Sequence, residues 1–189
     1  LGGSKSLPPP GWHSVTDSQF TYSLNLPEAW HIIDLNLSPE APGLKSSPPL
    51  QVLGSLFASL ASDSEMILLG TEDTAVFNTG SPVFVVVAQS QRLQQLPPNE
   101  MVSYVQQRLP ENVTLVEANT VEGISTELKG NMLFNIEQNE QNEQLWRCQA
   151  QLILSDSTSY LLAACTSFGQ FPLQLNDFET IVGSFQALG

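Results

Sequence analysis

Residues 145–168 read LWRCQAQLILSDSTSYLLAACTSF, two apolar runs on either side of a short polar break at residues 155–159. Serine, threonine and aspartate favour turns, so this stretch predicts a β-hairpin. We close the hairpin symmetrically about Asp156 and Ser157 and expect it in the middle of an antiparallel sheet. The register then pairs Leu154 with Ser159, Leu152 with Leu161, Ala150 with Ala163, and Cys148 with Cys165.

The alternation of side chains along both strands gives the hairpin two different faces. One face is polar on the first strand and apolar on the second, which predicts partial cover. The other face is apolar throughout and is expected to line the core. Its members are Trp146, Cys148, Ala150, Leu152, Leu154, Leu161, Ala163 and Cys165.

The two cysteines of the chain stand opposite each other in this register. Directly opposed residues of a non-hydrogen-bonded pair lie about 4.5 Å apart between Cα atoms, near the lower limit for a disulfide. Two interpretations stay open. The favoured one is a pair of small buried thiols in a tight core. The other is a Cys148–Cys165 disulfide, which implies an oxidising compartment.

The overall composition fits one globular domain. The chain has 189 residues, of which 41% are hydrophobic and 13% charged, enough for one well-buried core. We expect a single domain over residues 12–189. Residues 1–11, which end in LPPPG, read as a flexible Pro/Gly-rich linker that holds the domain off whatever precedes it, such as a lipid anchor.

The charge balance excludes one class of partner. The formal net charge is -13, with 19 acidic and only 6 basic residues, and the basic residues are scattered. Nucleic-acid binding needs clustered positive charge, so no nucleic-acid partner is expected. No apolar run approaches 18 residues, and no transmembrane span is expected either.

The rest of the chain alternates between short strands and a few helices. Apolar spacing predicts helices over residues 50–61, from about 96 to 110, and over 173–188. The strands are mostly joined in neighbouring hairpins, which indicates an α+β domain on an antiparallel sheet. The continuous apolar run at residues 83–88 favours helices on both faces, an α/β/α sandwich. Besides the hairpin, strands are expected over 12–17, 20–26, 30–37, 65–70, 83–88, 112–119, 122–128 and 132–136, with a turn at 129–131.

Two segments carry a resemblance to a known family. Residues 20–30 read FTYSLNLPEAW, an aromatic-led alternating strand followed by proline, a small residue and tryptophan. Residues 181–185 read IVGSF near the end of the last helix. Together they resemble the PsbP-like superfamily, which includes PsbP proteins, Mog-type Ran-binding proteins and DcrB- and LpqN-type lipoproteins. The resemblance implies the α/β/α fold and a non-enzymatic binding or accessory role, often outside the cytoplasm.

Two weak groups of metal-ligand candidates are present. Glu137, Glu140 and Glu143 recur every third residue in a polar stretch, and oxygen-rich loops suit hard cations such as Ca²⁺. The spacing lacks the EF-hand pattern, so a solvated loop is the favoured interpretation. His13 and His31 each follow a tryptophan, on strands expected to be close in the sheet. Two imidazoles are half of a transition-metal site, and surface histidines are the favoured alternative.

No residue pattern points to catalysis or to a cofactor. The chain lacks the Gly-x-Ser-x-Gly elbow and any glycine-rich phosphate loop. We therefore expect no enzyme, no cofactor and no assigned metal. The leading hypothesis is a non-catalytic protein-interaction domain, outside the cytoplasm, that binds a protein partner through an acidic, Gln/Asn-rich face or a sheet edge. The alternatives are a small-molecule or divalent-metal binding protein, and a cytoplasmic location.

Overall fold

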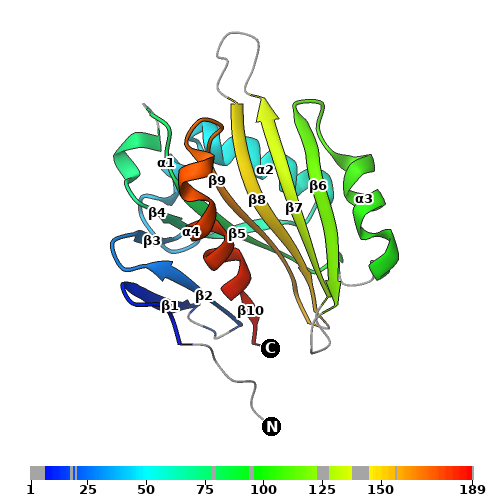
Figure 1. Cartoon of the computed structure of the whole chain (residues 1–189), viewed down its shortest axis with the longest axis horizontal. Coiled ribbons are helices and arrows are strands. Elements are labelled where there is room, and N and C mark those ends of the chain that lie inside the picture. Colours follow the sequence, from blue (N-terminus) through cyan, green and yellow to red (C-terminus); the bar gives the residue numbers. More distant parts are fainter. Residues whose placement is uncertain are drawn as a thin grey trace.

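The computed structural model describes residues 7–17, 19, 21–77, 80–93, 96–122, 128–137, 145–155 and 157–188. These residues form a large sheet, a small sheet and several helices (Figure 1). The strands are β1 (Trp12–Thr16), β2 (Tyr22–Pro27), β3 (His31–Asp34), β4 (Glu65–Thr71), β5 (Phe84–Ser90), β6 (Val113–Glu122), β7 (Leu128–Glu137), β8 (Leu145–Leu154), β9 (Ser159–Ser167) and β10 (Gln186–Ala187). The helices are α1 (Ala41–Lys45), α2 (Pro48–Leu60), α3 (Met101–Arg108) and α4 (Phe171–Ser184), with short 3-10 turns at Thr74–Phe77 and Pro98–Glu100.

The large sheet has seven antiparallel strands in the order β3-β4-β5-β9-β8-β7-β6. The hairpin predicted from residues 145–168 is β8 and β9, at the centre of this sheet. Its predicted register is confirmed, with Leu152 opposite Leu161, Ala150 opposite Ala163 and Cys148 opposite Cys165. The small sheet has the order β1-β2-β10.

Each face of the large sheet has its own apolar core. On one face, α2 places Leu53, Leu56 and Phe57 against the apolar side of the β8–β9 hairpin. α3 adds Met101 and Val105 to the same core. The helical spacing of these residues follows from the 3.6-residue period, and prolines at the first two positions of α2 suit a helix start.

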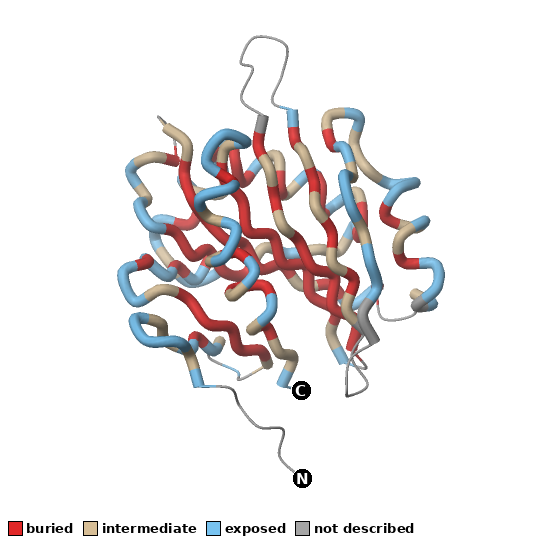
Figure 2. The backbone as a smooth tube through the Cα atoms, viewed as in Figure 1, coloured by how far each residue is buried: buried red, intermediate tan, exposed pale blue. Residues whose placement is uncertain are grey.

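The second core lies on the opposite face, between the large sheet and a mixed layer. That layer consists of α4 and the small sheet, whose Tyr22, Leu24 and Leu26 are fully buried. Burial is accordingly concentrated in the strands at the centre of the molecule (Figure 2). The α+β fold is as expected, while the α/β/α layering holds only in part because a small sheet shares the second layer with a single helix.

One predicted turn is wrong. Residues 129–131 lie inside β7, which pairs with β6 (Val113–Glu122). The strand predicted over 122–128 falls mostly on residues 123–127, which lie outside the described residues. The glycine that suggested the turn has a packing role, since a Cβ atom on Gly130 would collide with the Met101 sulfur. Tertiary packing therefore decides the conformation of this segment.

The C-terminal helix is shorter than predicted. α4 ends at Ser184, and the chain then adds β10 to the small sheet beside β2. None of the helices in the described part of the chain is long and apolar enough to cross a membrane.

Candidate functional site

A groove of about 610 Å³ runs between α4 and the strands β6, β7 and β8. α4 packs on β9, β2 and β8, so it covers the central part of this face and leaves the β6 side open. In Figure 1, β8, β7 and β6 lie beside α4 with no helix in front of them. The floor of this amide groove carries Asn119 of β6, Asn131 of β7, and Gln149 and Gln151 of β8.

The register of the sheet brings these polar side chains together. Asn119 pairs with Asn131, and Asn131 with Gln151, so that three amides lie in one row across three strands. The next residue in that row, on β9, is the buried Leu162. The face therefore changes from apolar to polar at β8, at the limit of the cover that α4 provides. This is the polar side of the hairpin that the sequence predicted to be partly covered.

Two hydrogen bonds order the side chains of the floor. Gln151 Nε2 donates to Asn131 Oδ1 at 2.7 Å, and Arg147 Nε donates to Asn135 Oδ1 at 2.9 Å. The Arg147 guanidinium carbon also lies 4.5 Å from the ring centre of Phe168. Contacts of this kind fix the orientation of a guanidinium. Arg147 is thus held at one end of the groove.

Two buried carbonyl oxygens in the floor lack a partner among the described residues. They are Oε1 of Gln149 and Oε1 of Gln151, and the Gln151 side chain is only 4% exposed. A buried acceptor without a hydrogen bond costs about 1–3 kcal/mol. Such atoms are uncommon in folded proteins. Solvent does not reach either oxygen in this conformation, so a donor in the groove bonds to them only when the two side chains turn toward it.

The two walls of the groove differ in chemistry. α4 presents the apolar side chains of Phe171, Leu175 and Val182, together with the exposed carboxylate of Glu179. The opposite wall, on β6, presents the exposed carboxylate of Glu117. An acceptor floor therefore lies between two acidic groups, beside an apolar helix face.

The metal-ligand candidates do not come together in the described residues. His13 is on β1 of the small sheet and His31 on β3 of the large sheet, so they are not neighbours in one sheet. Glu137 is exposed at the end of β7, while Glu140 and Glu143 lie outside the described residues. Across the described ranges, His, Cys, Asp and Glu form no group of three or more that could hold a metal ion.

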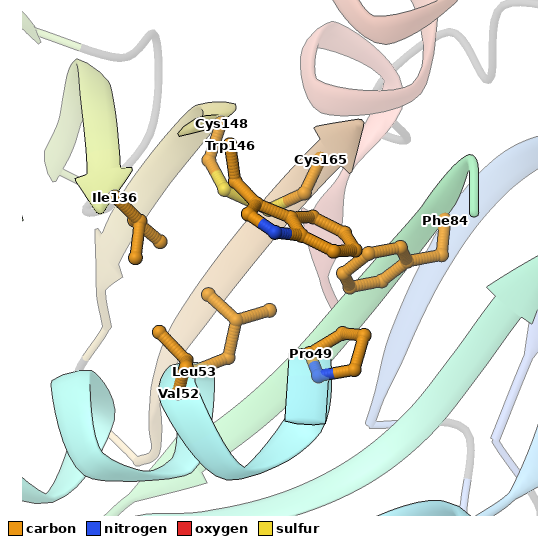
Figure 3. A pocket seen from close by; sticks show the side chains of 8 residues that line it. All are labelled: Pro49, Val52, Leu53, Phe84, Ile136, Trp146, Cys148 and Cys165. Carbon is orange, nitrogen blue, oxygen red and sulfur yellow. A yellow bond between two sulfur atoms is a disulfide. The ribbon is translucent and has the colours of Figure 1, made fainter. Parts of the chain in front are cut away.

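Cys148 and Cys165 are joined in a disulfide, with their Cα atoms 4.2 Å apart. The bond is buried in the core on the opposite face from the groove. Trp146, Phe84 and Leu53 surround it and leave a cavity of only about 10 Å³ (Figure 3). That space holds one water molecule at most, so this cavity has no room for a ligand.

Sequence reasoning named an acidic, Gln/Asn-rich face but did not find the groove itself. The available signal was the recurrence of Asn131, Asn135, Gln149 and Gln151 at alternate positions of two strands. The false turn at residues 129–131 broke that pattern, because it removed Asn131 from the strand.

Comparison with known proteins gives the fold. No family model and no curated protein sequence matches this chain. The solution structure of the cyanobacterial PsbP protein CyanoP from Synechocystis sp. PCC 6803 is similar, with a TM-score of 0.55 at 11% identity over 100% of this chain and 99% of that chain. The crystal structure of protein PA94 from Pseudomonas aeruginosa gives a TM-score of 0.43 at 10% identity, over 89% and 91% of the two chains. The chain has a PsbP-like fold, as the resemblance of residues 20–30 and 181–185 implies.

Proposed function

We propose that this chain is a non-catalytic accessory domain that binds a segment of a partner protein in the amide groove. The observation that carries the proposal is the pair of unpartnered carbonyl oxygens of Gln149 and Gln151 at the bottom of an open groove. A bound polypeptide supplies hydrogen-bond donors along its whole length. It would satisfy both oxygens once the two glutamine side chains turn toward the groove, while its own side chains pack on the apolar face of α4.

The residues of the groove support a binding role. Its described lining contains two carboxylates and one arginine, but no serine, threonine, cysteine or histidine. Hydroxyl, thiol and imidazole nucleophiles are therefore absent from the described lining, and its two carboxylates, which can also act as nucleophiles, are exposed and stand on opposite walls. Both cysteines of the chain are joined in the disulfide.

A location outside the cytoplasm is part of the proposal. The buried Cys148–Cys165 disulfide supports it, because such bonds persist in oxidising compartments and are rare in the cytosol. A count of free thiols tests it, made under denaturing conditions without reductant on protein taken from its native compartment. We expect no free thiol, and two free thiols would reject this part.

A small organic molecule is the second candidate occupant. The groove volume of about 610 Å³ falls within the range of roughly 300–1,000 Å³ that is typical of ligand pockets. The long open side toward β6 favours a chain that runs through the groove over a ligand enclosed by it.

The test uses a variant that fills the groove and a matched control. Gly183 lies on α4 at the groove, and a Cβ atom there meets nothing within 4 Å. Gly43 of α1 has the same free space and is not among the groove residues. Gly183→Trp should block the groove, and Gly43→Trp should leave it open.

A displayed library of random peptides is selected on the disulfide-bonded wild-type chain, and the affinity of each enriched peptide for the two variants is measured. We expect Gly183→Trp to weaken binding at least tenfold and Gly43→Trp to leave it unchanged, with thermal unfolding showing that both variants are folded. Equal affinity for wild type and Gly183→Trp, or no enrichment above the level seen with Gly183→Trp, would reject the groove as the binding site.

A further inference from the structure

The two atoms in the floor of the amide groove that lack a hydrogen-bond partner are both acceptors. The Gln151 side chain uses its amide nitrogen to donate to Asn131, so the oxygen is the atom left without a partner. Gln149 likewise has a buried oxygen that accepts no hydrogen bond from the described residues. A ligand that meets both oxygens must therefore be a donor, and a carboxylate or phosphate would add repulsion there.

The charges around the floor narrow the choice of donor. Glu117 and Glu179 carry exposed carboxylates on opposite walls, and both line the groove. The positive group at the site, Arg147, is engaged at one end by Asn135 and the Phe168 ring. The chain as a whole has a net charge of -13. Those contacts are with uncharged groups, so Arg147 keeps its charge, but the two carboxylates outnumber it. A cationic donor gains from the carboxylates at short range and from the whole field at long range.

The shape of the cation follows from the apolar wall. Leu175, which is 37% exposed, offers α4 surface along which an aliphatic stem packs before its charged end reaches the floor, and the buried Phe171 and Val182 lie beside it. A guanidinium presents five N–H donors in a fixed plane, enough for two amide oxygens and a carboxylate together, whereas an ammonium has three donors at one point. We infer that the amide groove binds an arginine side chain of the partner segment, with its guanidinium over Gln149 and Gln151 and between Glu117 and Glu179.

This inference rests on the proposed function, since it names the residue by which the bound segment is recognised. The probe is a blocked pentapeptide, Gly-Gly-Arg-Gly-Gly, and the control peptide has norleucine in place of arginine. The readout is the NMR signal of the side-chain amide groups of Gln149 and Gln151 in the isotope-labelled, disulfide-bonded chain. We expect these two signals to shift and saturate with the arginine peptide and to stay in place with the norleucine peptide.

The variant for this test is the double change Glu117→Gln and Glu179→Gln, which keeps size and removes both charges at exposed positions. The expected result is a dissociation constant for the arginine peptide at least tenfold higher than for wild type. The control is Glu65→Gln with Glu72→Gln, exposed positions that are not among the groove residues and should leave the constant unchanged.

The outcomes separate the inference from the proposed function. The first outcome concerns the library peptides whose binding is weakened by Gly183→Trp. If these peptides contain no arginine, or if they bind the double glutamine variant as tightly as wild type, the arginine inference fails and the groove remains the binding site. If the arginine peptide shifts signals elsewhere and leaves those of Gln149 and Gln151 unmoved, the inference also fails. If Gly183→Trp has no effect on any peptide, both fail.

Discussion

Gly130 near the start of β7 lies directly against the sulfur of Met101 at the start of α3, at a distance that leaves no room for a side chain on the strand. Met101 and Gly130 are both buried, and Met101 belongs to the core between α2, α3 and the large sheet. The contact sets how closely α3 approaches β7. It is also the reason that a glycine interrupts an otherwise regular strand.

Gly130→Ala should therefore destabilise the chain. The added methyl group forces the Met101 side chain out of its position in a packed core. A thioether side chain is flexible, so the cost lies at the lower end of the about 1–3 kcal/mol that overpacking brings. Urea unfolding followed by tryptophan fluorescence measures the change. Gly43→Ala in α1, where a Cβ meets nothing within 4 Å, should cost nothing and serves as the control.

A double-mutant cycle identifies the cause. If the clash with Met101 is responsible, Met101→Ala should remove most of the added cost of Gly130→Ala, because the shorter side chain leaves space for the methyl group. Simple additivity of the two changes would point to a backbone effect of alanine in the strand instead.

Reduction of the disulfide should lower stability more than it alters the fold. Cys148 and Cys165 are 17 residues apart, and a cross-link over a loop of that length contributes about 2–4 kcal/mol. The variant Cys148→Ala with Cys165→Ala should lose that amount in urea unfolding. Its stability should not change when reductant is added, whereas wild-type protein reduced while unfolded should approach the variant. A variant as stable as the oxidised wild type would contradict this prediction.

Acid pH should destabilise the fold through one carboxylate, which accepts hydrogen bonds from the loop after β5. Burial opposes the ionisation of Asp63, but hydrogen bonds from Ser90 Oγ and from the backbone N–H groups of Gln91 and Arg92 outweigh it and lower the pKa of Asp63 from its ordinary value of 3.8. Because the folded state holds the proton less tightly, this carboxylate stabilises the fold above its unfolded pKa. That contribution is lost as the pH falls through the lower, folded pKa.

Asp63→Asn should accordingly destabilise the chain at pH 7 and make little difference at the acid end, below the folded pKa. Ser90→Ala removes one of the donors that lower the pKa of Asp63, so it should move that pKa back toward 3.8. An NMR titration of the Asp63 carboxyl carbon in wild type and Ser90→Ala checks the direction. A pKa that does not rise in Ser90→Ala would show that the hydroxyl group has no part in the shift.

The hairpin could be predicted from the sequence because apolar residues alternate in the same register along both strands, on either side of one turn. The local pattern and the strand pairing therefore agree at residues 145–168. The same reasoning failed at residues 129–131, where glycine and asparagine favour a turn locally and the contact with Met101 requires a strand. The amide groove depends on the lateral order of β6, β7 and β8 and on how far α4 extends across them. Neither is encoded in the periodicity of any single segment.

The position of β9 has a consequence for how the protein is made. β9 is the last long strand along the chain, yet it lies at the centre of the large sheet between β5 and β8. Until β9 has been made, the strands of the large sheet fall into two separate groups, β3-β4-β5 and β6-β7-β8. The edges of β5 and β8 that β9 later joins then have no partner strand. Unpaired edges of this kind invite pairing with other chains. Joining the two groups, and bringing Cys165 to Cys148, must therefore wait until β9 has been made.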